Sequence, residues 1–123
     1  MYVAGVYMLY RGSCHCGTIA FEAEGTLEQA MDCNCSHCSR KGYLLWFVER
    51  AKFSLKSPAE DQLGTYTFNK HAIKHHFCVK CGCAPFGFGI HPKGGSMAAV
   101  NVRCLEDIDR SQLKIVPVDG KSL

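Results

Sequence analysis

The sequence lacks any strong excess of one charge. Its 14 Lys and Arg residues are set against 11 Asp and Glu residues, and the formal net charge is only +3. The basic residues are scattered along the chain, whereas a nucleic-acid-binding surface usually gathers them on one face. Nucleic acid is therefore not the favoured partner.

Long apolar segments are missing as well. The apolar opening, Met1–Tyr10, contains no basic residue, and it is shorter than the stretch of about 20 residues that a membrane-spanning helix needs. We expect it to form a strand rather than an export signal, and we expect no membrane association. A chain without an export signal is expected in the cytoplasm, where thiols stay reduced.

Helical periodicity is scarce, because only Thr26–Ala30 and Leu105–Leu113 could hold a helical turn. Turn-forming Gly and Pro residues recur at intervals of about eight to twelve residues, a spacing typical of all-β domains. Strands are predicted in the intervening segments rich in β-branched and aromatic residues, namely Thr18–Ala23, Tyr43–Val48, Gly64–Phe68, Ile73–Cys78, Phe86–Ile90 and Met97–Val102. The pattern predicts a mainly β fold with little helix.

The length of 123 residues is close to the commonest size of one domain, so we expect a single domain over residues 1–123. The polar tail after Pro117 is expected to fray, as chain ends do when nothing holds them. A small β domain has exposed strand edges that can pair with a second copy, so a homodimer is compatible with this sequence.

Cysteine, by contrast, is abundant. Nine cysteines is an odd number, and in a reducing compartment they are better candidates for metal ligands than for disulfides. Seven of them form three clusters: Cys14-His15-Cys16, Cys33-Asn34-Cys35-Ser36-His37-Cys38 and Cys78-Val79-Lys80-Cys81. A glycine lies beside two clusters, at Gly12, Gly17 and Gly82, where a tight turn calls for a positive φ.

Two ways of pairing these clusters are open. In one, Cys14 and Cys16 join Cys78 and Cys81 in a closed four-sulfur site, which leaves Cys33, Cys35 and Cys38 as a three-ligand site. In the other, the middle cluster helps to close the structural site. The first is favoured because the middle cluster packs three thiols within six residues. Four protein ligands are typical of structural zinc, and three with one exchangeable position are typical of reactive zinc.

Two cysteines lie outside these sites. We expect Cys104 to be a small buried apolar residue. Cys83 forms its own C-x-C pair with Cys81. We expect it to be an ordinary free cysteine, and the roles of substitute ligand and of reactive thiol stay open as alternatives. The neighbours His75 and His76 face opposite sides of a predicted strand and cannot bind one metal together. Most histidines of that strand are expected at the surface.

The chain resembles the glutathione-dependent formaldehyde-activating enzymes and their relatives with a centromere protein V domain. The resemblance is carried by Gly12-Ser13-Cys14-His15-Cys16-Gly17, by the segment from Cys33 to Arg40, by Phe77-Cys78-Val79-Lys80-Cys81-Gly82, and by the run from Asn101 to Leu105. It implies a β-tent fold stapled by two zinc ions per chain. It also implies a structural zinc on Cys14, Cys16, Cys78 and Cys81, and a second zinc on Cys33, Cys35 and Cys38.

The resemblance further implies a carbon–sulfur lyase that joins glutathione and formaldehyde and also runs in reverse. In such a reaction His37, inside the ligand loop, is the candidate proton donor. Arg40 and Lys41 are candidates to attract an anionic substrate such as glutathione. The alternative function is a non-enzymatic zinc module that binds a protein or chromatin partner, and a second zinc capped by Cys83 would favour it.

Overall fold

The computed structural model describes residues 2–91 and 93–122, which form ten strands, one α-helix and five short 3-10 helices. The strands are β1 (Tyr7–Ser13), β2 (Ala20–Thr26), β3 (Gln29–Cys33), β4 (Leu45–Glu49), β5 (Phe53–Ser57), β6 (Gly64–Tyr66), β7 (Lys74–Phe77), β8 (Phe86–Ile90), β9 (Ser96–Asn101) and β10 (Lys114–Val118). The helices are η1 (Arg50–Lys52), η2 (Glu60–Gln62), η3 (Val102–Cys104), η4 (Arg110–Gln112), η5 (Gly120–Ser122) and α1 (Ser36–Lys41).

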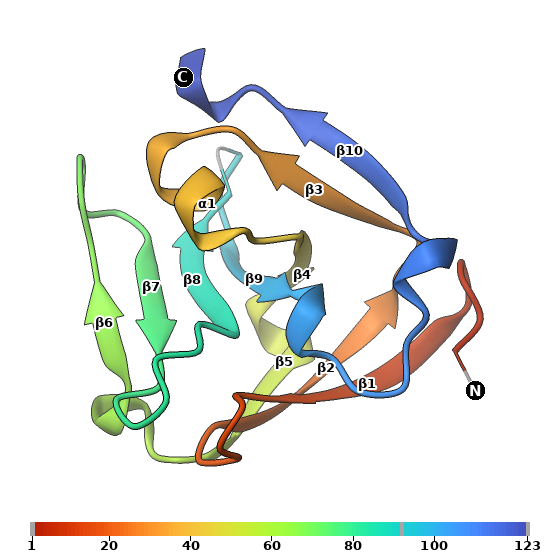
Figure 1. The fold of residues 1–123 in the computed structure, drawn as a ribbon, viewed down its shortest axis with the longest axis horizontal. Helices are drawn as coiled ribbons and strands as arrows, with labels where there is room; N and C mark the ends of the chain where they lie inside the picture. Colours follow the sequence, from red (N-terminus) through yellow and green to blue (C-terminus); the bar gives the residue numbers. More distant parts are fainter. Residues whose placement is uncertain (1, 92, 123) are drawn as a thin grey trace.

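These strands form two sheets (Figure 1). The smaller sheet has the order β1-β2-β5, and the larger has the order β10-β3-β4-β9-β8-β7-β6. Every pair of neighbouring strands is antiparallel except β10 and β3, which run parallel. The parallel pair brings the end of the chain beside the first ligand segment of the middle cysteine cluster.

Aromatic side chains join the two sheets in one core. The ring of Phe21 on β2 lies 5.4 Å from the ring of Phe86 on β8, and the rings of Tyr10 on β1 and Trp46 on β4 are also 5.4 Å apart. All four side chains are buried. Since a fully buried large apolar side chain contributes about 1.5–3 kcal/mol, this aromatic layer is a main source of the stability that holds the sheets together.

The predicted fold class is confirmed. Strands account for 44% and helices for 18% of the described residues, so the fold is mainly β. All six predicted strand segments hold a strand, although the opening strand begins only at Tyr7; Met1 lies outside the described residues. No helix in the described part of the chain has both the length and the apolar character needed to cross a membrane.

Other predictions about local structure were wrong. The segment Thr26–Ala30 holds no helical turn, because it contains the end of β2 and the start of β3. The α-helix lies instead inside the middle cysteine cluster, as α1. It begins where Sγ of Cys35 accepts a hydrogen bond from the Cys38 amide, and it ends at Gly42, whose φ of 71° is left-handed. Leu105–Leu113 does hold one turn, η4.

The tail from Val118 to Ser122 is not frayed in the structure, and Leu123 lies outside the described residues. Strand β10 pairs with β3 up to Val118, opposite Cys33. The next residues form η5 and bond to the side chain of Asn34. The tail therefore has partners that its polar composition did not reveal.

Candidate metal centre

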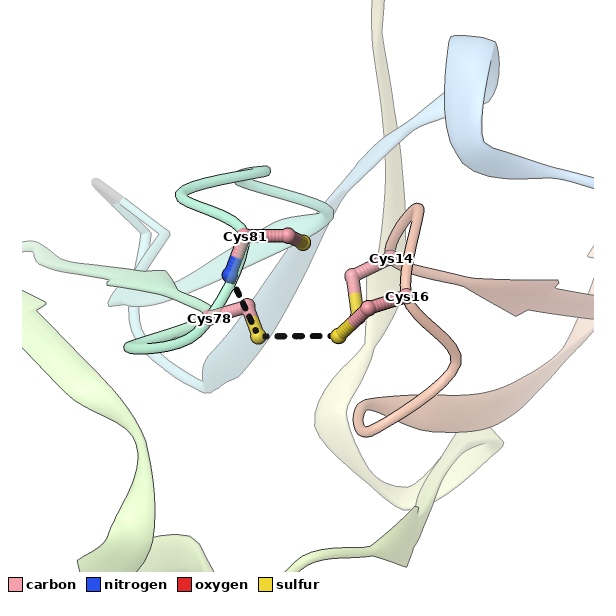
Figure 2. Close-up of side chains that lie close together, drawn as sticks. All are labelled: Cys14, Cys16, Cys78 and Cys81. Carbon is pink, nitrogen blue, oxygen red and sulfur yellow. Dashed lines mark hydrogen bonds between the residues drawn. The ribbon is translucent and has the colours of Figure 1, made fainter.

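Four sulfurs from two distant loops converge at one point (Figure 2). Cys14 and Cys16 follow β1, and Cys78 and Cys81 follow β7; all four Sγ atoms lie within 4.8 Å of one another. The Sγ atom of Cys16 is 3.7 Å from that of Cys14 and 3.6 Å from that of Cys78. A tetrahedral zinc with sulfurs about 2.3 Å away separates them by about 3.8 Å, so this group of residues fits the ion.

Backbone amides also point at these sulfurs. The Ile19 amide donates to Sγ of Cys14 at 3.2 Å, and the amides of Lys80 and Cys81 donate to Sγ of Cys78 at 3.4 Å. Donors of this kind favour the thiolate form, which is the form that binds metal. The loops therefore direct backbone N–H groups at the sulfurs that a metal ion would bind.

The glycines of these loops have different roles. Gly17 and Gly82 have φ values of 85° and 77°, the left-handed conformation expected there. Gly12 does not, and that expectation was wrong. A Cβ atom at Gly12 would lie 2.3 Å from the ring of Phe21, so this position requires glycine because the core packs directly against its backbone.

The thiols of the four-cysteine group differ in acidity. The hydroxyl of Thr18, 3.2 Å from Sγ of Cys16, lowers the pKa of Cys16 to about 6. Burial raises the pKa of Cys14 to about 11, against the opposing effect of the Ile19 amide. An exposed thiolate beside a buried thiol is an arrangement in which a cation would stabilise both charged forms.

A second group forms within one short segment. Cys33 ends β3, Cys35 caps α1 and Cys38 lies inside that helix; their Sγ atoms are within 4.8 Å of one another. In residues 2–91 and 93–122, no fourth Cys, His, Asp or Glu joins this group. Burial raises the pKa of Cys38, whereas at Cys35 the Cys38 amide and the neighbouring thiols outweigh burial and lower the pKa.

A pocket of about 900 Å³ opens beside helix α1. Its lining is mostly aromatic and basic, and comprises Ser36, His37, Arg40, Lys41, Tyr43, Tyr66, Phe68, His75, His76, Phe77, Gly82 and Ala84. Ser36 and His37 connect the pocket with the cysteines, because both line the pocket and lie between Cys35 and Cys38 at the start of α1. The pocket therefore borders the second cysteine group.

Comparison with known proteins identifies the family. Residues 9–117 match the model of the glutathione-dependent formaldehyde-activating enzymes. The chain belongs to this family. It is also similar to the crystal structure of a protein from Rhodobacter sphaeroides, with 29% identity over 87% of this chain and 97% of that chain and a TM-score of 0.74.

Within this family member, the pocket is built around two histidines. The rings of His37 and His75 have centroids 4.2 Å apart, and Tyr66 and Phe68 stack beside them. Both ring nitrogens of His37 are buried without a hydrogen-bond partner. Burial lowers the pKa of His37, and it lowers that of His75 to about 4, so both rings are neutral at pH 7.

The outcome for the neighbouring histidines is mixed. His75 faces the pocket while His76 contacts the core ring of Phe88, with centroids 5.1 Å apart, so the two do point to opposite faces. The expectation that most histidines here lie at the surface was wrong, because His76 is 3% exposed and only His71 is well exposed. The buried ring of His76 forms a hydrogen bond with the hydroxyl of Thr65, with Nδ1 and Oγ1 3.1 Å apart.

Arg40 and Lys41 lie at the pocket rim. The guanidinium of Arg40 bonds to the carbonyl of Ser36 at 2.8 Å, and Nζ of Lys41 lies 5.8 Å from the centre of the Phe77 ring. Both residues line the pocket and are exposed to solvent, so they place positive charge where the pocket meets the surface. They are thus placed where an anionic ligand would pass.

Cys83 joins neither metal group in the structure. Its Sγ lies 3.6 Å from Sγ of Cys104, and both residues are partly buried. Burial raises the pKa of Cys104 to about 12, which keeps that thiol neutral. Sequence spacing paired Cys83 with Cys81, and only the fold shows that it turns to Cys104 instead.

Proposed function

We propose that this protein is a zinc-dependent carbon–sulfur lyase that joins glutathione and formaldehyde into S-hydroxymethylglutathione and also catalyses the reverse. The observation that carries the proposal is the three-cysteine group, which has no fourth protein ligand among the described residues and borders a basic, aromatic pocket. The family match over residues 9–117 supports this activity and supports a single domain.

The two cysteine groups fit two zinc ions with different roles. Four sulfurs at the separation of a tetrahedral site suit a closed, structural ion, held by Cys14, Cys16, Cys78 and Cys81. Three sulfurs suit an ion with one exchangeable position, held by Cys33, Cys35 and Cys38. A zinc ion held by these three cysteines would supply Lewis acidity and would favour the thiolate form of a substrate thiol.

The pocket supplies recognition. Arg40 and Lys41 at its rim attract the carboxylates of glutathione before contact is made. The stacked rings of Tyr66 and Phe68 offer an apolar wall against which the substrate can pack. Together these residues hold the tripeptide near helix α1.

His37 has the unpaired ring atoms that the reaction needs. A neutral imidazole has one donor and one acceptor nitrogen, and both are without partners here. As the glutathione sulfur bonds to the formaldehyde carbon, the carbonyl electron pair moves to the oxygen, and the thiol proton ends on that oxygen. We assign to His37 the hydrogen bond that guides this proton, and the step needs no oxidant or reductant.

The test is exchange spectroscopy by NMR on zinc-loaded protein with glutathione and formaldehyde. We expect exchange between free glutathione and its adduct to be faster than in protein-free buffer, and we expect the Cys35→Ser variant to lose this acceleration. An exchange rate equal to the uncatalysed rate would overturn the proposed activity. It would favour a zinc module that binds another macromolecule.

A further inference from the structure

Residues 118–122 lie directly against the three-cysteine group. Strand β10 runs parallel to β3 with Val118 opposite Cys33, the last residue of β3 and the first ligand of the group. The Asn34 amide extends this pairing by donating to the Val118 carbonyl at 3.0 Å. The residues that follow Val118 therefore lie beside the three-cysteine group.

The side chain of Asn34 fastens these residues from between two ligands. Its Nδ2 donates to Oδ1 of Asp119 at 3.0 Å, and its Oδ1 accepts from the Lys121 amide at 2.9 Å. Asp119 also accepts a hydrogen bond from the hydroxyl of Ser122 at 2.7 Å. The Asn34 side chain thus hydrogen-bonds to both Asp119 and Lys121 and holds the turn between them in place.

Gly120, at the centre of this turn, packs directly against the sulfur of Cys33. A Cβ atom at Gly120 would lie 2.4 Å from Sγ of Cys33 and 3.3 Å from Cβ of Cys35. Its φ is outside the left-handed region, so the backbone does not require glycine here. Close contact with the ligand sulfur is the reason that no side chain fits.

We propose that residues 119–122 form a cover on the Cys33 side of the second metal site, with Asn34 and Gly120 as its positioning residues. The cover shields one side of the three-cysteine group from water and chelators, which slows loss of the metal. A substrate thiol must therefore approach the metal from a side that the cover leaves open. The inference rests on the proposed second zinc, but the docking of the tail does not depend on the lyase activity.

The test combines two measurements on the zinc-loaded, full-length protein. Asn34→Ala and Asp119→Ala remove the side-chain bonds, and Gly120→Ala forces the turn away from Cys33; Asp61→Ala, an exposed acid in η2, is the matched control. Hydrogen exchange of residues 119–122 reports whether the turn has been released. Transfer of zinc to a colorimetric chelator reports the exposure of the metal.

We expect the three tail variants to release one of their two zinc ions about three to ten times faster than wild type, the size expected for one or two lost hydrogen bonds. The other zinc, and both zinc ions of Asp61→Ala, should leave at the wild-type rate. Unchanged release from variants whose tail is shown to be free would overturn the cover. Because Asp119 and Gly120 lie outside the ligand loop, failure of Asn34→Ala to fold would not prevent the test.

A separate readout covers the case in which the proposed function fails. If the wild-type protein carries no zinc at the three-cysteine group, alkylation of Cys33 by iodoacetamide, mapped by peptide mass spectrometry, measures the same shielding. Faster alkylation of Cys33 in Asp119→Ala than in wild type supports the cover. Equal rates with a released tail contradict it, whatever reaction the protein catalyses.

Discussion

The sulfur of Cys16 lies 3.6 Å from the sulfur of Cys78, so one contact joins chain positions that are 62 residues apart. The first belongs to the loop after β1 in the smaller sheet, and the second to the loop after β7 in the larger sheet. A metal ion held at this junction would close a long loop of chain and tie the two sheets together, which is why we propose a structural role for it.

Loss of one ligand of this group should therefore unfold the protein. Structural zinc contributes on the order of 10 kcal/mol in zinc-finger peptides, which is comparable with the whole stability of a small domain. We expect Cys81→Ser to be unfolded or insoluble, by circular dichroism and thermal melts. Its control is Cys104→Ser, which removes a thiol outside both groups and should cost only about 1–3 kcal/mol while keeping the zinc content. A Cys81→Ser protein with a wild-type melting temperature would contradict the role.

The three-cysteine group should respond differently, because it closes only a short loop. Serine at position 35 keeps an oxygen that can accept the Cys38 amide, and serine is a favoured N-cap, so helix α1 should persist. We expect Cys35→Ser to stay folded, to lose about one zinc ion and to lose activity. Thermal melts and metal analysis decide this; an unfolded Cys35→Ser would reverse the two roles.

The pocket histidines make a prediction about pH. The pKa of His75 is lowered from 6.5 to about 4, chiefly by burial, so the folded state resists a proton that the unfolded chain accepts. The stability associated with neutral His75 is complete above pH 6.5 and falls as the pH drops toward 4. Between pH 7 and pH 5 we expect wild type to lose up to about 1 kcal/mol more than His75→Phe, after allowance for partial exposure. Melting curves in excess zinc test this, and parallel losses in the two proteins would refute it.

Charge at the rim should govern substrate affinity more than turnover. Lys41→Ala removes a cation that lines the pocket and is no member of either cysteine group, so KM for glutathione should rise several-fold with little change in kcat. The wild-type KM should also rise with salt, because screening weakens steering. Lys114→Ala, an exposed lysine on β10, is the matched control. Equal KM values for the two variants would remove Lys41 from substrate recognition.

The metal groups could be predicted from sequence because their ligands are close in the chain or beside recognisable turns. The cluster from Cys33 to Cys38 needs only one helical turn to bring its sulfurs together. The pairing of the first and third clusters was favoured by spacing and implied by family resemblance, and the fold brings those four sulfurs together. That all seven bind zinc stays a prediction.

Contacts between distant segments were beyond such reasoning. Strand β10 was missed because Pro117 and the polar tail argue against a strand, yet an edge strand tolerates proline. The partnership of His37 with His75 depends on how α1 packs against β7, which no local pattern encodes. His37 in the ligand loop and the basic pair Arg40 and Lys41 were the sequence signals of this pocket, and they did not reveal the second ring.

The most direct test of the account is the number of zinc ions per chain, measured by native mass spectrometry on protein purified with zinc present. We predict two ions in wild type and one in Cys35→Ser, because one group is closed by four sulfurs and the other holds three. A wild-type chain that carries a single zinc ion, or the same number as Cys35→Ser, would contradict the second metal site and the activity proposed for it.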